Sequence, residues 1–95
     1  SDGSPRERTA PTQFGAEVAC EQFVEDRLKS PSTADFSDPV HTKLSDDQFL
    51  VEGNVDSENG FGATIRAAWA CTVKAVPSGD TYDWELVEPV KIAQR

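Results

Sequence analysis

Residues 61–75 alternate so that every second side chain is apolar, and this pattern limits the fold more than any other feature of the chain. In FGATIRAAWACTVKA the apolar positions run from Phe61 through Trp69 to Val73. Successive side chains of a β-strand point to opposite faces of a sheet, so a period of two gathers these residues on one face. The segment therefore predicts a long strand with one buried side.

Three shorter segments, 40–44, 48–56 and 81–88, also carry strand signals, and turn-forming residues separate them. Loops of three or four residues join all four segments into a meander in which one inside face is kept throughout. In the middle hairpin the loop is Glu58-Asn59-Gly60, with Gly60 at the position of positive φ, so that Phe61 faces inward. The predicted cross-strand pairs are Val55–Ala63 and Phe49–Trp69 in the middle hairpin, Cys71–Trp84 in the last hairpin, and Thr42–Val51 in the first.

An amphipathic helix precedes the strands, because Ala16, Cys20, Val24 and Leu28 recur at helical spacing. Thr12 is placed to cap its start, and Pro31 disfavours helical geometry beyond Lys29. Residues 30–39 are expected to form an irregular crossover anchored by Phe36. Because one helix has to cover the apolar face, the sequence predicts an α+β fold with an N-terminal helix on a four-stranded antiparallel meander, cystatin-like in outline.

Ninety-five residues are enough for one domain. Residues 1–11 are polar with two prolines, so we expect a flexible leader or tether there and a single α+β domain over residues 12–95. A tether to a membrane or lipid anchor, or to a preceding domain, has this composition. No apolar run approaches the roughly 20 residues that a membrane-spanning helix needs.

Two cysteines, Cys20 and Cys71, are expected on the apolar helix face and the inward strand face. They either form a disulfide that ties helix to sheet or remain two buried thiols. We favour the disulfide, because closing a loop of about 50 residues stabilises a small domain by roughly 4 kcal/mol in the chain-entropy model. Such a bond indicates an oxidising, extracytoplasmic compartment.

Two motifs carry a resemblance. LKSPSTADF (residues 28–36) follows the cysteine-bearing helix, and VDSENGFGATIR (residues 55–66) precedes the strand cysteine. Together they resemble a set of small uncharacterised domains of actinobacteria and their phages, frequently exported or lipoprotein-like, over about residues 17–87. The resemblance implies an α+β domain and no catalytic residue. It also implies that a phage-encoded version would act on a host envelope protein.

Catalytic and metal-binding patterns are weak in this chain. An EF-hand starting at Asp56 would need a ligand where Gly60 stands and glutamate where Ala67 stands, so the acidic turn does not predict calcium binding. His41, the only histidine, is expected to be exposed on an edge segment, and no P-loop or dinucleotide motif is present. The QFLVEG stretch at residues 48–53 is one residue longer than the cystatin inhibitory loop. We therefore expect that the protein is not an enzyme and that it binds no metal and no cofactor.

The opposite face of the predicted sheet carries a small apolar strip ringed by charges, with Arg66 opposite Glu52. Such residues are ordinary surface features or a patch for self-association or partner docking. We name it as a candidate docking face because the predicted pairing makes the strip contiguous. Its apolar members are Leu50, Ala68, Ala70 and Val87.

The net charge of −8 does not favour binding to nucleic-acid phosphates. The sequence favours a non-enzymatic protein-binding module outside the cytoplasm, with either a protein partner or a second copy bound. Its surfaces would be the open sheet face and the turn containing Asp56, Glu58, Asn59 and Gly60. The alternative is an intracellular acidic decoy for a basic protein; a protease inhibitor or enzyme is less favoured.

Overall fold

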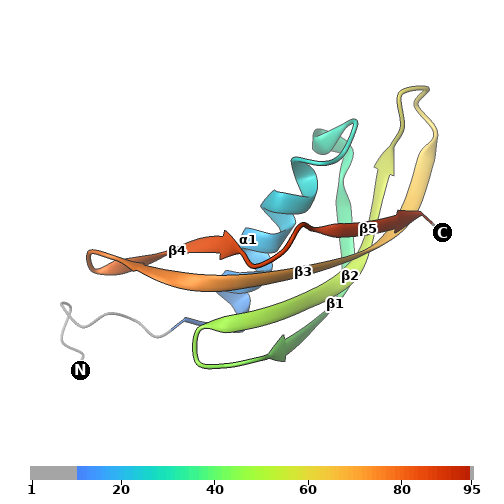
Figure 1. Cartoon of the computed structure of the whole chain (residues 1–95). Coiled ribbons are helices and arrows are strands. Elements are labelled where there is room, and N and C mark those ends of the chain that lie inside the picture. The colour runs from blue at the N-terminus through green and yellow to red at the C-terminus, as the bar shows by residue number, and fades with distance from the viewer. Residues whose placement is uncertain (1–10, 95) are drawn as a thin grey trace.

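The computed structural model describes residues 11–94, which form one α-helix and a five-stranded antiparallel sheet (Figure 1). Strand order is β1-β2-β3-β4, and β5 pairs with the part of β3 that β4 leaves open. The predicted α+β class and meander are confirmed, and β5 is an unpredicted addition. The predicted leader lies outside the described residues except for Pro11. The elements are α1 (Gln13–Glu25), the 3-10 turn η1 (Pro31–Thr33), β1 (Asp35–Lys43), β2 (Gln48–Glu58), β3 (Thr64–Ser78), β4 (Thr81–Leu86) and β5 (Lys91–Gln94).

Helix α1 lies across one face of the curved sheet (Figure 1) and buries Ala16, Cys20 and Val24, which are four residues apart. The predicted cap is confirmed, because the Thr12 hydroxyl oxygen accepts a hydrogen bond from the Gly15 amide at 3.1 Å. The predicted end near Lys29 is wrong: α1 ends at Glu25, and tighter turns carry the chain on to η1. A 13-residue helix is only about 20 Å long.

The middle hairpin keeps the predicted inside face but not the predicted register. Val55 lies opposite Ala67 rather than Ala63, and Phe49 lies opposite Val73 rather than Trp69. The whole ladder has moved by four residues, an even number, so the same side chains still point inward. Alternation alone does not separate registers that differ by an even shift.

Glycine and tryptophan explain the observed register. Trp69 lies opposite Gly53, and a Cβ atom added to Gly53 would come within 3.1 Å of the Trp69 ring. The indole therefore occupies the space that a side chain at residue 53 would take. It also makes an edge-to-face contact with Phe36, with ring centroids 6.0 Å apart. Phe36 is thus the predicted anchor, although it lies in β1 and not in an irregular crossover.

The outer hairpins differ from prediction for separate reasons. The last has a tight loop with Gly79 at φ 61°, so Trp84 lies opposite Ala75 instead of Cys71 and packs edge-to-face on Phe49. The first contains a bulge between Ser37 and Val40, and its register differs by one residue. An odd shift exchanges faces, and His41, not Thr42, therefore lies opposite Val51.

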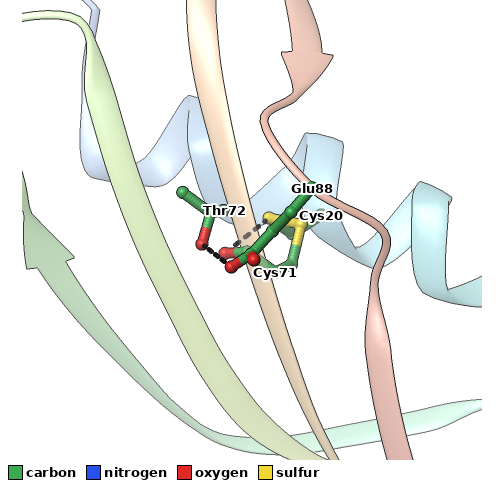
Figure 2. Close-up of a disulfide and its surroundings, with 4 residues drawn as sticks. All are labelled: Cys20, Cys71, Thr72 and Glu88. Atoms are coloured by element: carbon green, nitrogen blue, oxygen red, sulfur yellow. Dashed lines mark hydrogen bonds between the residues drawn. A yellow bond between two sulfur atoms is a disulfide. The ribbon is translucent and has the colours of Figure 1, made fainter.

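The predicted disulfide is confirmed. Cys20 in α1 and Cys71 in β3 are bonded, with Cα atoms 5.9 Å apart. Both residues are almost fully buried among valines and alanines. Next to it on β3, Thr72 donates from its hydroxyl to a Glu88 carboxylate oxygen at 3.4 Å (Figure 2). The disulfide thus ties the centre of α1 to the centre of β3, the longest strand.

Replacing both cysteines with alanine (Cys20→Ala with Cys71→Ala) should lower the free energy of unfolding by up to about 4 kcal/mol, because the bond closes 51 residues of the unfolded chain. Urea unfolding of the variant and of the reduced wild-type protein measures this loss and separates it from the side-chain change. Unreduced protein should be two hydrogens lighter than the dithiol by intact mass. A full dithiol mass would contradict the bond.

Candidate functional site

The two motifs that carry the resemblance meet in the structure. The hydroxyl oxygen of Thr33, from the first motif, accepts a hydrogen bond from the amide of Glu58, in the second, at 2.9 Å. The same hydroxyl donates to the carbonyl of Ser30 at 2.7 Å. Phe36 lies opposite Val55 in the β1–β2 ladder. The turn after α1 therefore fixes the loop end of the β2–β3 hairpin.

The loop of this hairpin is fixed by one asparagine. The Asn59 side-chain oxygen accepts hydrogen bonds from the amides of Phe61 and Ala63, at 2.8 and 3.1 Å. The Asn59 amide donates to the Ala63 carbonyl at 2.9 Å, which closes the loop. The predicted positive φ at Gly60 is wrong, because the left-handed residue is Gly62 at φ 83°. The loop is longer than predicted, yet its backbone is held from within.

Phe61 lies in this loop with its side chain 97% exposed. The predicted inward position of Phe61 is wrong, because the ladder begins at the pair Glu58–Thr64 and leaves Phe61 in the loop. Figure 1 shows the hairpin extending beyond the end of α1. A fully exposed phenylalanine on a projecting, internally bonded loop is the most distinctive surface feature of the described residues.

A cavity of about 260 Å3 lies beside the loop end of the hairpin, and we call it the hairpin pocket. Leu28, Ile65, Ala67 and Ile92 give it an apolar lining. These side chains come from the turn after α1, from β3 and from β5. Leu28 and Ile65 belong to the two sequence motifs, and Ala67 lies on the inward face predicted for residues 61–75. Ile92 was missed because four residues of β5 are too few for a strand signal.

The rim of the hairpin pocket is charged. Arg27 and Lys29 lie on its helix side, and Glu58 and Asn59 lie on its hairpin side. Arg27 donates to the carbonyl oxygen of Val90 at 3.5 Å. Two cations therefore surround an apolar hollow in a chain whose net charge is −8.

Only part of the predicted acidic turn belongs to this site. Glu58 ends β2, Asn59 and Gly60 lie in the loop, and Asp56 lies within β2. Asp56 binds Arg66 through two hydrogen bonds of 2.8 and 2.9 Å. The hydrogen bond from Arg66 lowers the pKa of the Asp56 carboxyl and raises that of the guanidinium. The predicted opposition of Arg66 and Glu52 is wrong, because Glu52 lies opposite Ala70.

The candidate docking face is not the contiguous strip that the sequence predicted. Leu50 lies opposite Thr72, and Ala68 lies between Asn54 and Ala93. Ala70 lies between Glu52 and Lys91. Val87 lies apart from the alanines: its amide donates to the Thr72 carbonyl, and the residue lines a cavity together with Phe23 of α1. The docking role of this face stays a prediction, but the contiguity that favoured it is absent.

His41 is not the exposed edge histidine that the sequence predicted. Its Nε2 atom lies 2.7 Å from a carboxylate oxygen of Glu17, and both side chains are about four-fifths buried. Glu21 follows one turn after Glu17. Burial, the charge of Glu17, a hydrogen bond with Glu17 and the charge of Glu25 raise the pKa of the Glu21 carboxyl, in that order of size. The contact between His41 and Glu17 joins α1 to β1.

Both cysteines are consumed by the disulfide. Within residues 11–94, no three His, Cys, Asp or Glu side chains are grouped so that they could hold a metal ion. In the same part of the chain, no helix has the length and apolarity needed to cross a membrane. Comparison of the chain with protein-family models, curated proteins and solved structures finds no match. The resemblance to actinobacterial and phage domains stays a prediction.

The Glu21→Gln variant should be more stable than the wild-type protein at neutral pH. A carboxyl whose pKa is raised on folding makes the protein lose stability as the pH rises from the ordinary value through the raised one. Removing the charge relieves two like-charged pairs at four-residue spacing, each worth about 0.2–0.5 kcal/mol.

Urea unfolding between about pH 4 and pH 7 checks this pH dependence. The gain should shrink toward the acidic end, where Glu21 is protonated in both the folded and the unfolded state. Glu52→Gln removes the same charge from an exposed strand position and is the matched control. An equal gain in stability in both variants would assign the effect to the lower net charge of the chain instead of to the row of glutamates on α1.

Proposed function

We propose that this protein is a non-enzymatic protein-binding module of an oxidising, extracytoplasmic compartment, and that the tip of its β2–β3 hairpin is the contact surface. The observation that carries the proposal is the 97% exposure of Phe61 on a loop whose backbone Asn59 holds with two side-chain hydrogen bonds. The hairpin pocket beside it extends the same surface.

An exposed phenylalanine gains free energy when a partner buries it, and a large aromatic side chain buries 150–250 Å2, as a typical range for Phe, Tyr and Trp. Aromatic residues are also overrepresented among the few that dominate binding energy. A loop that is already ordered loses little conformational entropy on binding. Phe61 combines an exposed aromatic side chain with an ordered loop. This combination favours the hairpin over the candidate docking face on the other side of the sheet as the binding surface.

The location outside the cytoplasm is supported by the buried disulfide, because cytosolic proteins rarely keep such bonds. An export signal, a lipid anchor and an origin in a phage that targets a host envelope protein are expectations of the sequence resemblance alone. The alternative, an acidic intracellular decoy for a basic protein, draws support from the net charge of −8 and the acidic row on α1. The disulfide weighs against it.

Affinity capture on immobilised protein from a host envelope extract should retain a partner that the Phe61→Ser variant loses. We expect at least a tenfold loss of retained protein, since removing an aromatic anchor typically weakens binding by 2 kcal/mol or more. Quantitative mass spectrometry of the bound fraction provides the measurement.

Two variants serve as controls for this capture. Phe14→Ser removes the other strongly exposed phenylalanine, on α1, and Leu50→Asp places a charge on the outer sheet face. Both should retain the partner. Loss with Leu50→Asp alone would return the contact to the predicted docking face. Capture that ignores Phe61 and disappears at raised salt would favour the acidic decoy.

A further inference from the structure

We propose that the partner which fits the hairpin surface is a second copy of this chain, with Phe61 of each copy seated in the hairpin pocket of the other. This inference rests on the proposed function, because it takes the hairpin as the contact surface and names its occupant. Four observations support it: the partly covered end of the sheet, the size of the hairpin pocket, the symmetry that the two contacts allow, and the charges around the pocket.

Helix α1 is too short to cover the sheet. Its 13 residues span about 20 Å, whereas the 15 residues of β3 span about 50 Å. At one end the gap is closed by Trp84, which packs against Phe49 and next to Gly15. At the other end Ile65 and Ile92 remain only partly buried and border the hairpin pocket. The inner face of the hairpin is therefore only partly covered by the described residues.

The size and lining of the hairpin pocket suit a phenylalanine side chain. An apolar cavity of about 150 Å3 accommodates a benzene molecule, and this pocket measures about 260 Å3. A benzyl group would therefore fit with room for the adjoining backbone. The Phe61 side chain does not occupy the pocket of its own chain, because it is 97% exposed.

The positions of Phe61 and the hairpin pocket allow a closed, symmetric pair. Phe61 and Ile65 are four residues apart on the same hairpin, at most about 14 Å along the chain. When two such hairpins lie antiparallel with their inner faces together, the tip of each hairpin reaches the hairpin pocket of the other. A two-fold axis then produces two identical contacts, which is the geometry of an isologous dimer.

Local charge complements this arrangement despite the acidity of the whole chain. Glu58 lies three residues before Phe61, and Arg27 and Lys29 lie on the pocket rim. Among residues 11–94 neither cation forms an ion pair within the chain. The hairpin of the second copy would carry its Glu58 toward these cations. Repulsion between two chains of charge −8 is screened beyond about 8 Å at physiological ionic strength.

Sedimentation velocity over a concentration series up to about 1 mM, at physiological ionic strength, tests the pair. The wild-type protein should show a reversible monomer–dimer equilibrium. Phe61→Ala should weaken the dimer about 30-fold or more, as expected for an aromatic anchor. The matched control Phe14→Ala removes an exposed phenylalanine from α1 and should leave the dissociation constant unchanged. Wild-type protein that stays monomeric, or dimers that survive Phe61→Ala, would overturn the inference.

Photocrosslinking locates the contact. Phe61 is replaced by p-benzoylphenylalanine in a mixture of 14N- and 15N-labelled chains, and mixed-isotope crosslinks should map to the segments around Leu28 and Ile92. Crosslinks elsewhere on the second copy would reject the proposed pocket. A monomeric chain whose residue 61 instead crosslinks to another protein, in the extract used for affinity capture, would reject the dimer and leave the binding function standing.

Discussion

The disulfide between Cys20 and Cys71 determines where α1 lies on the sheet, and the rest of the surface follows from that position. It joins the middle of a helix about 20 Å long to the middle of a strand about 50 Å long. Each end of the sheet therefore extends beyond the helix. Trp84 covers the inner face at one end, and at the other end the hairpin pocket stays open.

A second constraint, the packing of Trp69 on Gly53, sets how far the hairpin projects. A Cβ atom at residue 53 would lie only 3.1 Å from the Trp69 ring, so glycine gives the indole the most room at that position. The resulting register removes Phe61 from the ladder and places it in a loop that Asn59 holds together. A packing requirement in the core thus creates the exposed aromatic residue on the surface.

Charge is distributed unevenly over this small domain. Arg66 is neutralised by Asp56 within the sheet, and Glu17, Glu21 and Glu25 form an acidic row on α1. Arg27 and Lys29 lie instead at the rim of the apolar hollow. Apolar surface and positive charge coincide where the two sequence motifs meet, which is why we place binding there instead of on the outer sheet face.

The sequence by itself determined the class of the fold, the inward face of most strands and the cysteine pair. Period-two alternation and helical spacing are local properties, so the residues of β3 and of α1 show their faces without reference to the rest of the chain. The Thr12 cap and the core position of Phe36 were equally local signals.

Tertiary structure alone decided the register, the bulge in β1, the pairing of His41 with Glu17, strand β5 and the hairpin pocket. A shift by two or four residues preserves every inward face, so alternation carries no information about it. In the observed register the Trp69 ring packs over Gly53, a contact between residues that are distant in the sequence. Ile92 and Arg27 gain their roles only because distant segments converge, and contacts between residues far apart in the chain leave no periodic trace in its sequence.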